Sequence, residues 1–82
     1  MPEKVYTHVM KAMKLGKTAT EEIGDRIAQQ AKGFDDNGLP IMSVWMFFNI
    51  FTWYIIHKTV SLNHRVDMEK RLRAAMAHVR GR

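Results

Sequence analysis

The most apolar stretch of the chain runs from residue 39 to residue 56, with the sequence LPIMSVWMFFNIFTWYII and no charged side chain. Its aromatic residues, among them Phe48 and Trp53, turn to every side of a helix, which excludes an amphipathic surface stripe. Roughly 20 apolar residues, at about 1.5 Å each, cross a hydrocarbon core about 30 Å thick. A chain of 82 residues leaves little protein to surround such a helix. The pattern therefore predicts a transmembrane helix over residues 39–62.

Two short amphipathic helices are expected before this span. Residues 3–15 carry apolar side chains on one face at helical spacing and lysines on the other. A second helix is expected to begin at Thr18, with Ile23 and Ile27 as a thin apolar seam. Both helices belong to an extramembrane N-terminal segment, residues 1–38.

The segment after the span, residues 63–82, also keeps a helical period and forms a basic extramembrane tail. Neither Gly nor Pro occurs between Pro40 and Arg80, so one nearly straight helix is expected from Pro40 to about Val79. The expected fold class is all-α. A single transmembrane helix continues into a long extramembrane helix and is preceded by two short amphipathic helices.

The charge of the chain divides sharply at the span. Six Lys and Arg residues balance six acidic residues before it, whereas seven oppose two after it, so the whole net charge of +5 lies in the C-terminal part. By the positive-inside rule, the C-terminus faces the cytoplasm or its mitochondrial equivalent, the matrix. The chain has no cysteine, which excludes disulfides, thiolate metal sites and cysteine nucleophiles.

Candidate chemistry is sparse, and no catalytic, metal or cofactor residue is predicted. The Gly16-Lys17-Thr18 tripeptide lacks the glycine that a phosphate-binding loop needs five residues earlier. His57 could ligate a haem or chlorophyll at the edge of a span, but Trp53 occupies the position where a small residue would admit the macrocycle. The chain is therefore expected to act by binding and not as an enzyme.

Two polar groups of residues are assigned to the span and its edge. Asn49 lies in the middle of the span, with Ser43 and Thr52 nearby, and these three are predicted to pack against a neighbouring helix through hydrogen bonds. Lys58 and Arg65 are predicted to contact anionic lipid headgroups such as those of cardiolipin.

The tail is predicted to bind partner subunits. Beyond Arg65, its basic side chains Lys70, Arg71 and Arg73 lie too far from the membrane for headgroup contact, since anionic surface charge is screened within about 8 Å. Apolar residues on the same helix would complete the contact, whereas nucleic-acid binding is not expected. The predicted partner-binding residues are Lys70, Arg71, Arg73, Leu72 and Met76.

The whole pattern resembles the small supernumerary subunits of mitochondrial respiratory-chain complexes and of the ATP synthase. The resemblance rests on the basic amphipathic start MPEKVYTHVMKAMKLGK, the aromatic-rich span and the charged tail RVDMEKRLRAAMAHVRGR. It implies a single-pass protein of the mitochondrial inner membrane, part of the machinery of electron transport and oxidative phosphorylation. Such a non-catalytic accessory subunit would support assembly, stability and lipid organisation beside larger membrane-complex subunits.

Two alternative functions stay open from the sequence. One is a small pigment-binding subunit of a photosynthetic complex, which requires His57 to carry a macrocycle. The other is a holin-like bacterial or phage membrane protein, which would associate with copies of itself.

Overall fold

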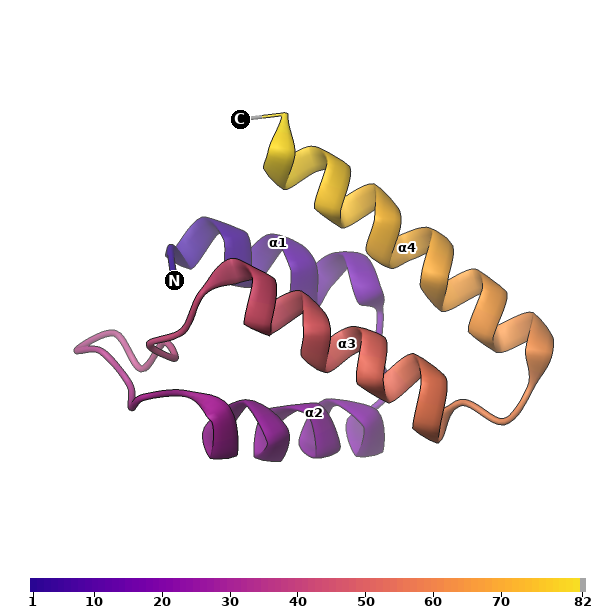
Figure 1. The fold of residues 1–82 in the computed structure, drawn as a ribbon, viewed down its shortest axis with the longest axis horizontal. Helices are drawn as coiled ribbons and strands as arrows, with labels where there is room; N and C mark the ends of the chain where they lie inside the picture. The colour runs from indigo at the N-terminus through magenta and orange to yellow at the C-terminus, as the bar shows by residue number, and fades with distance from the viewer. Residues whose placement is uncertain (82) are drawn as a thin grey trace.

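The computed structural model describes residues 1–81, and in that range the chain folds into four α-helices (Figure 1). They are α1 (Glu3–Met13), α2 (Lys17–Gln30), α3 (Val44–Lys58) and α4 (Leu62–Arg80). Helix α3 contacts both α2 and α4, and α1 packs against α4. The prediction of an all-α chain is confirmed, but the helices form one compact bundle with extents of 38 × 28 × 18 Å.

Helix α3 is the central element, and its apolar character follows from that position. Phe47 and Phe51 are completely buried, and their rings meet edge to face with centroids 5.0 Å apart. Tyr6 of α1 lies against Phe47 at 5.6 Å, which joins α1 to α3. The other helices each contribute one apolar seam to this core: Val9 and Met13 from α1, Ile23 and Ile27 from α2, and Met68, Leu72 and Ala75 from α4.

The α2–α3 connection is an ordered loop. Phe34 and Pro40 form an isolated antiparallel β-bridge. Asp35 Oδ1 accepts hydrogen bonds from the backbone N–H groups of Asn37 and Leu39, both at 2.9 Å. Helix α3 begins only at Val44, after Ser43. Pro40 therefore lies in the loop and not at the start of a helix, because it pairs with Phe34 in the β-bridge.

The helix predicted from Pro40 to Val79 is in fact two helices. Helix α3 ends at Lys58, and α4 begins at Leu62 with the hydroxyl of Ser61 accepting a hydrogen bond from the His64 N–H at 3.4 Å. The Arg65 guanidinium donates to the carbonyl oxygen of Thr59 at 2.9 Å, which closes the turn. The prediction of one long helix is wrong because burial of the α4 seam against α1 and α3 requires the chain to turn back (Figure 1).

The transmembrane prediction for residues 39–62 is also wrong. Within residues 1–81, no helix is both long enough and apolar enough to cross a membrane. Helix α3 has 15 residues, and at about 1.5 Å per residue it is shorter than a hydrocarbon core about 30 Å thick. Two assignments depended on this span: a single pass through the mitochondrial inner membrane, and a C-terminus that faces the matrix. The fold contradicts both.

Candidate functional site

Two aligned rows of side chains, one on α3 and one on α4, form an open surface of the bundle. Each row follows one helix face at spacings of four, three and four residues, which places its members in line. The helices run side by side in opposite directions (Figure 1), and at one end the Arg80 guanidinium lies 5.1 Å above the Trp45 ring. We call this surface the α3–α4 face; it consists of Trp45, Asn49, Thr52 and Ile56 with Glu69, Arg73, Met76 and Arg80.

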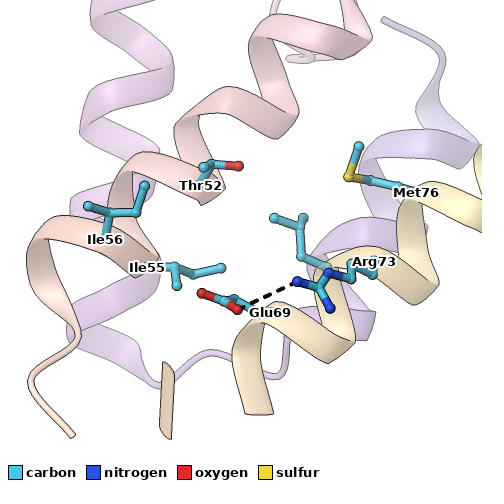
Figure 2. A pocket seen from close by; sticks show the side chains of 7 residues that line it. Thr52, Ile55, Ile56, Glu69, Arg73 and Met76 are labelled. Atoms are coloured by element: carbon cyan, nitrogen blue, oxygen red, sulfur yellow. Dashed lines mark ion pairs between the residues drawn. The ribbon is translucent and has the colours of Figure 1, made fainter. Parts of the chain in front are cut away.

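A groove of about 410 Å³ lies within this face, and all of its lining residues come from α3 and α4. Figure 2 shows Ile55 and Ile56 on one wall and Met76 on the other, with Thr52 farther along α3. Ile55 and Leu72 are buried, and their side chains form the apolar floor of the groove below the exposed Ile56 and the partly buried Met76. The groove is therefore a surface that could receive apolar side chains from another molecule.

Polar groups are also present on the α3–α4 face, and one of them is free to bond. The Asn49 carboxamide is exposed and makes no hydrogen bond with any described residue. Thr52 donates its hydroxyl to the Phe48 carbonyl at 3.1 Å. Glu69 and Arg73 form an ion pair at 3.8 Å, drawn as a dashed line in Figure 2. A ligand in the groove would thus meet one paired acid and base, and a ligand that extended along the α3–α4 face would also reach the free amide of Asn49.

The predicted helix-packing residues are divided by the fold. Asn49 and Thr52 share the α3–α4 face, so the structure brings them together. Ser43 lies outside that face and caps α3, since its hydroxyl accepts a hydrogen bond from the Met46 N–H at 3.1 Å. The contact of these side chains with a neighbouring helix stays a prediction.

The predicted partner-binding residues are also distributed over different surroundings. Arg73 and Met76 line the groove, Leu72 forms part of its floor, and Lys70 is exposed. Arg71 instead points toward α1, where its Nη1 donates to the Met13 carbonyl at 3.1 Å. Its Nη2 also pairs with Asp67 at 2.7 Å. Arg71 thus joins α4 to the end of α1 within the bundle.

A second exposed apolar surface surrounds the turn between α3 and α4. Val60 is 97% exposed and Leu62 is 72% exposed, with Val66 one turn farther along α4. We call these three residues the apolar tip. Beside them is a hollow of about 260 Å³ lined by Tyr54, Lys58, Thr59, Val60, Ser61 and His64.

The two residues assigned to lipid headgroups both lie near this tip. The Lys58 ammonium is 6.0 Å from the centre of the Trp53 ring, and the Arg26 guanidinium lies 4.2 Å from the same ring. Arg65 donates to the carbonyl oxygens of Ile56 and Thr59, at 3.4 and 2.9 Å. Arg65 therefore has a structural role, in addition to any contact with lipid, which stays a prediction.

Two further groups near the tip define its chemistry. Burial, and to a lesser degree the negative charge of Glu22, raises the pKa of Tyr54 above its ordinary value of 10.0. The Tyr54 hydroxyl thus keeps its proton at neutral pH and can donate a hydrogen bond. The His57 ring lies beside Trp53, with ring centroids 6.3 Å apart. Trp53 thus lies beside His57, in the position from which the sequence predicted that it would obstruct a macrocycle bound to His57.

Metal ligands do not gather in the part of the chain that the structure describes: residues 1–81 hold no group of three or more His, Cys, Asp or Glu placed to bind an ion. Comparison of the chain with protein-family models, curated proteins and solved structures finds no match. Sequence reasoning did not identify the α3–α4 face, although the common spacing of its two rows was a signal that could be read from the sequence.

Proposed function

We propose that this protein is a small accessory subunit that acts by binding, and that it holds one helix of a larger protein partner in the groove between α3 and α4. The observation that carries this proposal is the open groove with its buried apolar floor, lined from both sides by α3 and α4. Its apolar parts, Ile56 and Met76, lie on opposite walls. A side chain that enters between them would lose contact with water, which is the main source of binding free energy.

A helix is the occupant that fits the two rows. The row from Trp45 to Ile56 spans roughly 16 Å along α3, which equals about three helical turns. Helices in grooves are recognised through anchors spaced three and four residues apart, and the α3–α4 face repeats that spacing on both walls. The partner helix would lie along α3 and α4 and add a third helix to the pair.

The charges of the face define the chemistry of the partner. Glu69 and Arg73 balance each other in their ion pair, so Arg80 and the neighbouring Lys70 leave an excess of two positive charges on its α4 side. Complementarity favours a partner helix that is apolar on one face and acidic along its flank. The free carboxamide of Asn49 would then bond across the contact, as an interhelical polar group does.

A photo-crosslinking amino acid at position 52 tests the proposal directly. Thr52 lines the groove, so the crosslink should join it to a segment of a larger protein that is helical, amphipathic and acidic on its flank. Ile56→Asp should abolish this crosslink because a carboxylate would be buried against the apolar wall. Ile41→Asp is the matched control, since Ile41 is exposed but lies outside the groove, and it should leave the crosslink intact.

Two outcomes would overturn the proposal. One is a crosslink to a second copy of this chain, which would make the face a self-association surface. The other is a crosslink that survives Ile56→Asp at its original yield, which would show that the groove is not the binding surface.

A further inference from the structure

The apolar tip shares no residue with the groove between α3 and α4. Val60 and Leu62 project from the turn between α3 and α4, which lies at one end of the long axis of the molecule (Figure 1). Both side chains are aliphatic. Protein interfaces are instead anchored by aromatic and Arg side chains that enter pockets. A convex aliphatic tip fits a deformable apolar medium better than it fits a rigid protein pocket.

The charge around the tip has a single sign in the local sequence. From Tyr54 to Val66 the chain holds Lys58, Arg65 and two histidines but no Asp or Glu. Asp67, which follows, is paired with Arg71 at 2.7 Å. On the α2 side, Glu22 and Asp25 face Lys58 across a separate hollow that also holds Arg26. Glu22 and Asp25 balance Lys58 and Arg26, and Asp67 balances Arg71, so Arg65 leaves an excess of one positive charge near Val60 and Leu62. This excess complements an anionic surface.

The hollow beside the tip supplies hydrogen-bond donors. Its lining includes Tyr54, Lys58, Ser61 and His64, whose side chains carry hydrogen-bond donors, together with Val60 and Thr59. A phosphate oxygen accepts hydrogen bonds and favours a neighbouring cation. A phosphodiester in this hollow would lie beside Val60, and the exposed side chains of Val60 and Leu62 would then be free to contact the acyl chains of the same lipid layer.

We propose that the apolar tip binds the surface of an anionic phospholipid bilayer. Val60 and Leu62 enter the boundary between headgroups and acyl chains, the hollow holds a headgroup phosphate, and Lys58 lies over the anionic surface. This is the geometry of an interfacial contact, in which shallow apolar burial and attraction to anionic lipid act together. The contact is reversible and needs no helix that crosses the bilayer.

A fluorescent label at the tip tests this proposal. The chain has no cysteine, so Val60→Cys provides a unique attachment point for an environment-sensitive fluorophore. Vesicles of phosphatidylcholine with added phosphatidylglycerol should shift its emission to the blue, and added salt should reverse the shift. Vesicles of phosphatidylcholine alone should produce little change. Phe34→Cys is the matched control, since Phe34 is exposed on the α2–α3 loop, and its label should not respond.

Unlabelled variants separate the apolar contribution from the charged one. Replacing both Val60 and Leu62 with Ser should lower partition onto the anionic vesicles roughly tenfold. Lys58→Gln should lower it about fivefold, whereas Lys11→Gln, an exposed lysine on α1, should leave it unchanged. The replaced tip side chains are exposed, so unfolding curves should match the unmodified protein.

The proposal is overturned if the label at position 60 responds no more than the label at position 34. It is also overturned if the Ser double variant binds anionic vesicles as well as the unmodified protein. Loss of the groove crosslink in that double variant, without any vesicle binding by the unmodified chain, would show that the tip is a protein contact. The groove proposal would survive that result.

Discussion

Helices α3 and α4 are neighbours in sequence and in space, yet they differ in how much of their surface is apolar. Five α3 residues are buried on several faces of the helix, whereas the buried residues of α4, Met68, Leu72 and Ala75, share one seam. The difference follows from position, because α3 touches α2 and α4 directly and meets α1 through Phe47. A helix that is apolar nearly all round can thus indicate several protein neighbours as well as lipid.

Three short helices are enough to bury the core residues of the central helix α3. The helices α1, α2 and α4 each bury a narrow seam, yet together they enclose Phe47, Ile50 and Phe51 almost completely. One stripe of α3 stays open, and that stripe is a wall of the groove. The part of α3 that its own chain does not cover is therefore the part proposed to bind a partner.

The largest expected effect comes from the centre of α3. Phe51→Ala should lower the free energy of unfolding by about 3–5 kcal/mol, because the cavity would lie among residues from several helices. Ile56→Ala on the open stripe of the same helix should cost less than about 1 kcal/mol. Chemical denaturation of both variants measures the contrast. Equal losses would contradict the assignment of a buried side and an open side to α3.

The two arginines of the α4 ion pairs should differ in their contribution to stability. Arg71→Met removes the hydrogen bond to Met13 that joins α4 to α1, and should lower the free energy of unfolding by about 1 kcal/mol. Arg73→Met removes an exposed and longer ion pair, and should cost less than about 0.5 kcal/mol. Thermal or urea unfolding should rank them in this order. The reverse ranking would show that Arg71 does not join the two helices.

The serines that begin the two helices provide a finer test of the helix boundaries. Ser43→Ala and Ser61→Ala should each destabilise the protein by about 0.5–1 kcal/mol through loss of an N-cap. Amide exchange should quicken at Met46 in the first variant and at His64 in the second. Unchanged exchange at His64 in Ser61→Ala would indicate that α3 and α4 are joined as one helix.

The smallest effect is expected from the pKa of Tyr54. Burial raises this pKa in the folded protein above 10.0, so at high pH the unfolded chain loses its proton first. The stabilising contribution is complete below pH 10.0 and falls as the pH rises toward the higher pKa of the folded state. Tyr54→Phe should therefore lose less stability than the unmodified protein between neutral and alkaline pH, as measured by urea unfolding at each pH. Identical pH dependence would contradict the raised pKa.

The sequence by itself determined where most of the helices lie and which residues they bury. The apolar spacing in residues 3–15 identified α1, and Ile23 and Ile27 identified the seam of α2, because a period of 3.6 residues depends only on the local chain. The seam of α4 was visible for the same reason. The same spacing was present in the sequence for each row of the α3–α4 face. That the two rows form one surface depends on the two helices lying side by side in the fold.

Only the tertiary structure decided what surrounds α3 and where the long apolar helix is interrupted. Hydrophobic side chains leave water equally well for lipid or for protein, so the run from residue 39 to residue 56 does not specify which of the two it contacts. The turn after Lys58 likewise depends on contacts distant in sequence, since Arg65 closes it and Met68 and Leu72 gain a core only when α4 folds back. Burial against other helices of the same chain therefore decided between a span and a bundle.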